Sequence, residues 1–286
     1  GGGSIRIPAS CCGIVGMKPT LGNVGNLQPP DLFTANSYVG PMARDIADTA
    51  LLYEVIRGGD KRDPFGQAPT PTGRPTIPSL HGVKVAWLPT AGNRIDPQVE
   101  QLTTAAVQAM ADAGAEVEQI ELDFVALEKH FLVLLESTLA ARLGPQLADI
   151  EARLDPSLVA TIRKGLQHSA VDLHHAGFAR TQCFSQLQAL FNRFDVLVSP
   201  TLSAPPLSLD VDVAGDIEIA GQNAGTIRGA WYPYTYPMNL TGHPALSMPC
   251  GLTTEGLPVG LQLVGRWHDD RYLLSVAHLV EQLLGA

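Results

Sequence analysis

The sequence predicts an α/β fold, a mixed central β-sheet flanked by helices on both faces. Segments with strand character lie near both ends of the chain and a long helical region lies between them, an order typical of one α/β domain. Hydrophobic residues form 45% of the 286 residues and charged residues 16%, which excludes a disordered chain and provides for a sizeable core. We therefore expect residues 1–286 to belong to a single domain.

The N-terminal segment, residues 1–42, is rich in glycine and proline, which predicts loops and short strands. Its strand candidates are GIVGMKPT (13–20) and SYVGPM (37–42). A helix is expected over 45–57, because apolar residues recur there at helical spacing. Asp45 suits the N-cap of this helix, and a pair of glycines supplies its end.

The next part of the chain predicts a strand–helix–strand unit. Residues 60–80 contain five prolines and are expected to form a surface excursion. VKVAWLP (83–89) has the β-branched content of a buried strand. The Asp-Pro pair at 96–97 starts a helix that ends at Gly114, and AEVEQIEL (115–122) then alternates as a strand. Such a unit suits a crossover in a parallel or mixed sheet.

The C-terminal half begins with helical sequence over 124–194, in which we expect interruptions at two prolines and at Gly177. DVLVSPT (195–201) predicts a buried strand, and residues 202–236 show only weak periodicity. PALSMPCGL and PVGLQLVGR, within 244–266, predict a hairpin across TTEG, and the C-terminal segment DRYLLSVAHLVEQLLGA predicts a final helix.

Composition excludes several classes of partner. The net charge is −9 and no basic run occurs, so we expect no nucleic-acid partner. No apolar run approaches the roughly 20 residues of a membrane-spanning helix, so no membrane partner is expected. Cys11 and Cys12 are adjacent and no Cys-x-x-Cys occurs, which predicts reduced thiols that pack in the core. We expect a cytoplasmic protein.

Eight histidines raise the question of a metal site or a catalytic triad. His174 and His175 are neighbours in a predicted helix and point apart, and no His-Glu-x-x-His motif is present. No Gly-x-Ser-x-Gly motif surrounds any serine. We therefore expect neither a metal ion nor another cofactor.

In the opening residues GGGS, three glycines, which have no side chain, precede a serine. The absence of Cβ atoms lets several backbone N–H groups converge on one point. A phosphate loop would need a following Gly-Lys-Ser/Thr and a helix, and IRIPA, with Pro8, is not expected to open one. Acyl transfer fits better: the N–H groups of Gly1, Gly2 and Gly3 would hold an oxyanion while Ser4 attacks a carbonyl. For GGGS alone, a flexible turn or a tag remnant is an alternative.

The longer stretch GGGSIRIPASCCGIVGMKPT closely resembles the signature of the amidase signature family, the Ser–cis-Ser–Lys amide hydrolases. Further resemblances to that family occur in order along the chain, so the likeness runs from the first residue to the last helix. They are SYVGPMARDIADTALL (37–52), FDVLVSPT (194–201) and PMNLTGHPALSMPCGLTTEGLPVGLQLVG (237–265).

This resemblance implies that Ser4 is the acylated nucleophile and that backbone N–H groups of Gly1, Gly2, Gly3 and Ser4 form the oxyanion hole. It implies that Lys18 belongs to a structural Lys-Pro-Thr segment. It also implies a cis-serine and a base lysine upstream of Gly1, so we expect the chain to be the C-terminal portion of a longer amidase and inactive alone.

The function that the resemblance implies is hydrolysis of a small-molecule carboxamide to a carboxylate and ammonia or an amine. The aromatic residues Trp231, Tyr232 and Tyr236 are expected to line the acyl pocket, since they cluster in a poorly periodic region. One alternative is a glutaminase-type subunit of a transamidating complex. Another is a non-catalytic fragment or pseudo-enzyme scaffold, and a homodimer is an option for the full-length parent.

Overall fold

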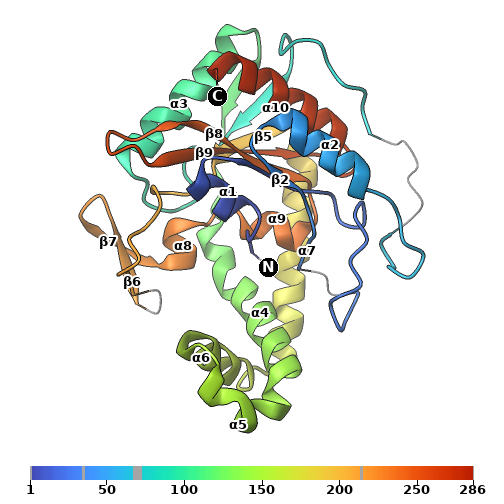
Figure 1. Cartoon of the computed structure of the whole chain (residues 1–286), viewed down its shortest axis with the longest axis vertical. Coiled ribbons are helices and arrows are strands. Elements are labelled where there is room, and N and C mark those ends of the chain that lie inside the picture. The colour runs from blue at the N-terminus through green and yellow to red at the C-terminus, as the bar shows by residue number, and fades with distance from the viewer. Residues whose placement is uncertain (1, 34–35, 67–72, 213–214, 286) are drawn as a thin grey trace.

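The computed structural model of the chain describes residues 2–33, 36–66, 73–212 and 215–285. Its centre is a seven-stranded mixed sheet of order β2-β1-β8-β9-β5-β3-β4, and β6 and β7 form a separate hairpin (Figure 1). The strands are β1 (Val15–Lys18), β2 (Met42–Ala43), β3 (Lys84–Trp87), β4 (Glu116–Gln119), β5 (Val196–Pro200), β6 (Asp216–Ile219), β7 (Gln222–Thr226), β8 (Ala245–Leu252) and β9 (Pro258–Gly265).

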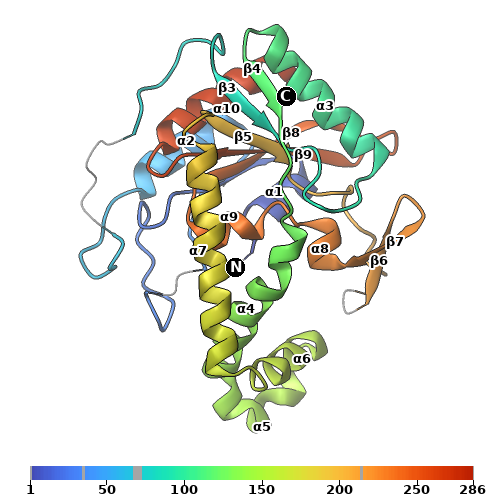
Figure 2. The same ribbon diagram turned by 180° about the vertical axis from the view of Figure 1, so that it is seen from behind.

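Helices cover both faces of the seven-stranded sheet, which confirms the predicted fold class (Figures 1 and 2). The α-helices are α1 (Arg6–Cys12), α2 (Ile46–Ile56), α3 (Pro97–Asp112), α4 (Glu128–Leu143), α5 (Leu147–Ile150), α6 (Pro156–Gly165), α7 (Ala170–Leu190), α8 (Ile227–Trp231), α9 (Tyr236–Thr241) and α10 (Asp270–Leu284). Short 3₁₀ turns lie at Val125–Leu127, Gly144–Gln146 and Glu151–Arg153.

The sheet separates two hydrophobic cores because successive side chains of a strand point to opposite faces. On β3, Val85 packs into the core beneath α2, α3 and α10, whereas its neighbour Ala86 packs into the core beneath α7 and α9. Leu263 and Val264 of β9 divide between the two cores in the same way. Both faces of the central strands are therefore buried, which explains their nearly continuous apolar sequences.

Two predicted units are confirmed. β3 and β4 pair in parallel, and helix α3 connects them in the sequence. The Asp96 carboxylate caps the start of α3. β8 and β9 form the expected antiparallel hairpin, and the Thr253 N–H donates to the Leu257 carbonyl in its turn. None of the helices in the described part of the chain is long and apolar enough to cross a bilayer.

Helices α4 to α7 form an arm that projects away from the sheet (Figures 1 and 2). The expected interruption at Gly177 is wrong, because Gly177 lies inside α7, which is one continuous helix of 21 residues. One interior glycine costs only about 1 kcal/mol. The Ser169–Asp172 capping box and the buried side chains of Cys183 and Leu187 stabilise the helix on either side of it.

The prediction that IRIPA opens no helix is also wrong, since α1 begins at Arg6. Pro8 is the third helical residue, where a backbone N–H has no acceptor within the helix and its absence costs little. The weakly periodic region 202–236 contains the β6–β7 hairpin and α8, which the sequence analysis missed. SYVGPM contributes only its last residue to the two-residue strand β2.

His243 is fully buried between aromatic rings at the junction of α9 and β8. Its ring stacks on Phe191 and lies near Phe184 and Trp267. Its Nδ1 lies 3.0 Å from the Thr241 hydroxyl, and within the described residues its Nε2 has no hydrogen-bond partner. Burial lowers the pKa of His243 to about 3, so the folded protein keeps this ring neutral.

We expect His243 to make stability depend on pH. The pKa of the His243 imidazole is near 6.5 in the unfolded chain and about 3 in the folded chain. The contribution of the neutral ring to the free energy of unfolding is therefore fully present above about pH 6.5 and is lost as the pH falls toward 3. The slope is about 1.4 kcal/mol per pH unit. Urea unfolding at pH 7, 6 and 5 should show a free energy of unfolding that falls less steeply with pH for His243→Phe than for the wild type. Equal slopes for the two proteins would contradict this prediction.

Candidate active site

Ser4 lies exposed in the turn that leads directly into α1. Gly3, immediately before it, is buried and has φ +147°, a value that side-chain-bearing residues rarely adopt. The Ile7 N–H donates to the Gly3 carbonyl at 2.8 Å, which fastens the glycine loop to the first turn of the helix. The loop is therefore ordered by the helix that follows it, while the serine hydroxyl faces solvent.

The glycines are required by space as well as by conformation. A Cβ on Gly3 would lie 2.6 Å from Thr235 Oγ1 and 2.7 Å from Ile7 Cδ1. A Cβ on Gly2 would lie 2.7 Å from the Phe131 ring, and the Thr235 hydroxyl donates to the Gly2 carbonyl at 2.6 Å. Neighbouring elements thus close around the main chain of the loop. Gly1 lies outside the described residues.

The N–H groups of Gly3 and Ser4 have no hydrogen-bond acceptor among the described residues. The Ser4 hydroxyl likewise makes no hydrogen bond within that part of the chain. An exposed hydroxyl beside unused backbone donors can attack a carbonyl carbon while the donors bind the resulting oxyanion. This arrangement is chemically suited to acyl transfer.

A cavity of about 80 Å³ lies beside Ser4. Its lining combines backbone of the glycine–serine loop with polar side chains from distant segments. The lining residues are Gly3, Ser4, Ile5, Arg6, Lys18, Ser37, Tyr38 and Asn239.

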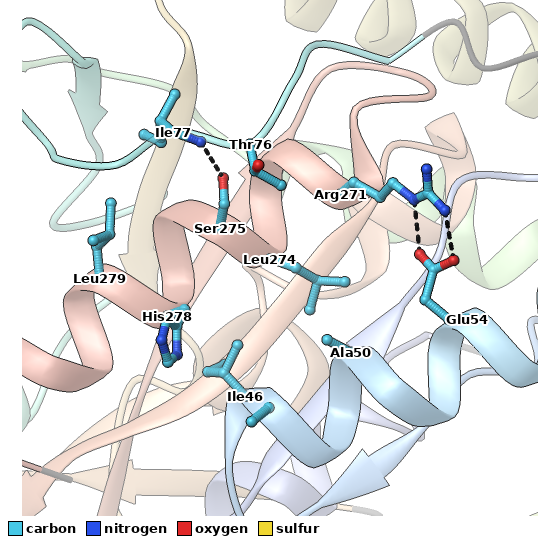
Figure 3. A pocket seen from close by; sticks show the side chains of 11 residues that line it. Ile46, Ala50, Glu54, Thr76, Ile77, Arg271, Leu274, Ser275, His278 and Leu279 are labelled. Atoms are coloured by element: carbon cyan, nitrogen blue, oxygen red, sulfur yellow. Dashed lines mark hydrogen bonds and ion pairs between the residues drawn. The ribbon is translucent and has the colours of Figure 1, made fainter.

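A larger cavity, about 450 Å³, lies between α2 and α10 (Figure 3). Its walls are largely apolar, and the Arg271 guanidinium donates two hydrogen bonds to the Glu54 carboxylate across one end. Its serine, Ser275, accepts from the Ile77 N–H and donates to the Tyr272 carbonyl. Because the side chains of Arg271, Glu54 and Ser275 already have hydrogen-bond partners, reactive chemistry is better placed in the smaller cavity at Ser4.

Arg6 anchors α1 to the rest of the fold. Its side chain is fully buried, and its guanidinium donates to Gln262 Oε1 at 2.6 Å, to Asn239 Oδ1 at 2.5 Å and to the Thr235 carbonyl at 2.9 Å. Gln262 lies on β9 and Asn239 on α9. Burial lowers the pKa of Arg6 to about 9.

Lys18, at the end of β1, is also buried. Its ammonium donates to the Pro19 carbonyl at 2.8 Å and lies 4.0 Å from the centre of the Tyr38 ring. Burial, and then the nearby Arg6 charge, hold the pKa of Lys18 well below its usual value. The sequence analysis treated Lys18 as structural; the fold places it in the wall of the Ser4 cavity.

None of the three aromatic residues expected in an acyl pocket lines the 80 Å³ cavity, as far as the described residues show. Tyr236 is fully buried, stacks on Phe131 and donates its hydroxyl to the Phe124 carbonyl. Tyr232 packs in the same cluster, and the Trp231 indole donates to the backbone of the loop that follows β5. Their role in substrate binding stays a prediction.

The cysteines are free within the described part of the chain, as expected. Cys183 is buried, but Cys12 is exposed and does not pack in a core. Burial raises the pKa of Cys11 to about 11, which makes that thiol a poor nucleophile. His174 and His175 lie on α7, where both rings are near Phe178. No group of side chains suited to a metal ion occurs among the residues that the structure describes.

Comparison with known proteins identifies the class to which this fold and serine loop belong. The family described as "Amidase" matches residues 1–274. The chain therefore belongs to the amidase signature family.

Individual relatives agree with this assignment. The chain is 30% identical over 284 residues to an acylamidase of Rhodococcus erythropolis, covering 97% of this chain and 58% of the relative. It is 32% identical over 309 residues to a glutamyl-tRNA(Gln) amidotransferase subunit from a Cyanothece species, covering 98% and 62%. The crystal structure of a bacterial aryl acylamidase superposes with a TM-score of 0.86 at 25% identity, covering 99% and 61%. The chain thus spans about three fifths of the length of these relatives.

Proposed function

We propose that this chain carries the nucleophile of an enzyme that hydrolyses carboxamides. The observation that carries the proposal is the exposed Ser4 hydroxyl beside the unused N–H groups of Gly3 and Ser4, in a member of the amidase signature family. The relatives include an acylamidase, and the structural neighbours include an aryl acylamidase, which supports an amide as the substrate class.

In the proposed reaction, Ser4 Oγ attacks the amide carbon and its proton leaves for a base. The carbonyl oxygen becomes an oxyanion held by the N–H groups of Gly3 and Ser4. The C–N bond then breaks, the leaving nitrogen takes a proton, and the acyl group remains as an ester on Ser4. Water hydrolyses the ester and releases the carboxylate.

The base and the relay serine that the family resemblance implies would come from residues upstream of Gly1. Within the described chain, Lys18 is the lysine that lines the Ser4 cavity, but its ammonium is bound to the Pro19 carbonyl. We propose that Lys18 supports the site without serving as the base. On this proposal, the proton of Ser4 leaves by a route that does not use Lys18.

A second candidate is a glutaminase-type subunit that passes ammonia to a partner. It is favoured by the relatives named as subunits of glutamyl-tRNA(Gln) amidotransferase, which are as similar to this chain as the acylamidase is. Assaying the parent protein, meaning this chain with whatever its gene encodes upstream of Gly1, against glutamine and against simple aryl amides separates the two. Turnover of aryl amides without glutaminase activity supports the first candidate.

We expect residues 1–286 alone to hydrolyse amides no faster than the same chain carrying Ser4→Ala. A serine hydroxyl is a weak nucleophile at neutral pH unless a base takes its proton, and Ser4 has no such partner among the described residues. Co-expression with the upstream residues should restore turnover, measured as aniline release from an anilide. Hydrolysis by the isolated chain that Lys18→Ala abolishes would show instead that Lys18 is the base.

A further inference from the structure

Thr235 is completely buried and lies immediately before α9, but its side chain does not cap that helix. Its hydroxyl instead donates to the Gly2 carbonyl at 2.6 Å and lies 3.2 Å from the Tyr232 carbonyl. A hydroxyl has one proton to donate, and the shorter distance favours the bond to Gly2. The glycine loop is therefore held by a side chain 233 positions further along the chain.

The Gly2 carbonyl and the Gly3 N–H belong to one peptide unit, which lies wholly within the described residues. A peptide unit is planar, and in the trans form its C=O and N–H point in opposite directions. The unit between Gly2 and Gly3 is trans, so the Gly3 N–H points away from the hydroxyl that binds the carbonyl. A hydrogen bond that fixes the carbonyl therefore also fixes the direction of the N–H.

Thr235 also holds the chain on the other side of the serine. Its backbone carbonyl accepts from the Arg6 guanidinium at 2.9 Å, and Arg6 follows Ser4 by two positions just as Gly2 precedes it by two. Ser4 thus lies between two attachments to one buried residue. These attachments restrict rotation of the glycine loop relative to α9.

The surroundings of the loop leave it little room for another orientation. A Cβ on Gly2 would lie 2.7 Å from the Phe131 ring, and that ring stacks on Tyr236, the residue after Thr235. Gly3 lines the 80 Å³ cavity together with Ser4, whereas Thr235 is not part of the lining, as far as the described residues show. The Thr235 hydroxyl therefore binds the loop from outside the cavity.

We propose that Thr235 is a positioning residue for amide hydrolysis, whose hydroxyl holds the Gly2–Gly3 peptide so that the Gly3 N–H is aimed at the oxyanion. This inference rests on the proposed function and adds to it a residue that touches neither the substrate nor the reacting atoms. Hydrogen-bond donors stabilise an oxyanion most when they are oriented before the reaction begins. Without the hydroxyl, the peptide can rotate, and orienting the Gly3 N–H becomes part of the barrier.

Thr235→Val in the parent protein removes the hydroxyl and keeps nearly the same side-chain shape. The kcat for an anilide should fall by about 10–100-fold, less than the roughly 10²–10³-fold loss that follows removal of a donor. KM should change little, because the oxyanion forms only as the reaction proceeds. Thr235→Ser, which keeps the hydroxyl, should recover most of the lost rate. A folded Thr235→Val protein with wild-type kcat, or equal losses in Thr235→Val and Thr235→Ser, would overturn the proposal.

The matched control is Thr103→Val. Thr103 is a completely buried threonine of α3, and its hydroxyl donates to the Val99 carbonyl at 2.7 Å. This variant loses a comparable buried hydrogen bond far from the glycine loop, so its kcat should match the wild type. Thermal melting of both variants separates a lower rate from a less stable fold.

NMR of the parent protein labelled with ¹³C,¹⁵N-glycine follows the peptide itself. A correlation between the Gly3 N–H and the preceding carbonyl carbon reports on both ends of the Gly2–Gly3 unit. In Thr235→Val the Gly2 carbonyl carbon should move upfield, because a hydrogen bond deshields a carbonyl carbon. The glycine pair at 58–59 should stay in place as an internal control. An unchanged Gly2 resonance would overturn the proposal, and Thr235→Ala repeats the measurement if Thr235→Val does not fold.

Phosphonylation of Ser4 in the wild-type parent distinguishes failure of this inference from failure of the proposed function. A phosphonyl oxygen on Ser4 stands in for the oxyanion, so the Gly3 N–H resonance should move downfield when the label is attached. If Ser4 takes the label and this resonance does not move, the Gly3 N–H is not aimed at the oxyanion and the positioning role is wrong, whatever the variants do. If Ser4 takes no label and the parent hydrolyses no amide, the proposed function fails and the positioning role fails with it.

Discussion

Replacing Ser4 by alanine in the parent protein is expected to abolish amide hydrolysis, with a loss on the order of 10⁴-fold or more. No other group would then form the acyl ester that divides the reaction into two easier steps. The fold should be unaffected, because the Ser4 side chain is exposed and makes no hydrogen bond within the described structure. Equal thermal melting of the two proteins would separate lost chemistry from lost structure.

Labelling with a fluorophosphonate, followed by mass spectrometry, identifies the nucleophile directly. The label should appear on the peptide containing Ser4 and be absent from the Ser4→Ala variant. Ser37 lines the same cavity and has no proposed nucleophilic role, so Ser37→Ala is the matched control and should retain the label. A label on another residue, or activity of Ser4→Ala within tenfold of the parent, would refute the assignment.

Gly3→Val in the parent protein is expected to lower kcat by about 10²–10³-fold, the usual effect of losing one oxyanion donor. Valine cannot readily adopt φ +147°, and its Cβ would lie 2.6 Å from Thr235 Oγ1, so the loop must move. The N–H groups of Gly3 and Ser4 would then point away from the developing oxyanion.

The control for this substitution is Gly177→Ala, in the middle of α7. A Cβ at Gly177 meets no atom within 4 Å, so kinetics should be unchanged and helix stability slightly increased. Thermal melting shows whether Gly3→Val is folded before its rate is interpreted. A folded Gly3→Val protein with near-normal kcat would exclude the backbone of this loop as the oxyanion hole.

Local sequence was sufficient for elements whose signals lie within the element itself. The β8–β9 hairpin followed from two apolar segments flanking a short turn, and α3 followed from the Asp-Pro pair at 96–97 and the apolar spacing after it. Local signals failed where tertiary contacts outweigh them. Pro8 and the β-branched residues around it argued against a helix, yet α1 forms because contacts with β1, β8 and β9 outweigh a weak local preference. The β6–β7 hairpin was missed because its local signals are short: β6 alternates buried and exposed residues over only four positions, and β7 is mostly polar and has no buried residue.

The sequence by itself determined that this chain belongs to the amidase signature family and identified Ser4 as the candidate nucleophile. Both conclusions follow from one continuous stretch, Gly2 to Thr20, which contains the family signature and its serine. Only the tertiary structure decided what surrounds that serine. Arg6 and Asn239 are 233 positions apart and meet through a hydrogen bond, and Lys18 reaches the same cavity from the end of β1. The spacing of residues along the chain does not predict such long-range contacts, because they depend on how the complete fold places α1 relative to α9. The same long-range packing determines that these two basic groups are buried without a carboxylate partner among the described residues, and their charge depends on that burial.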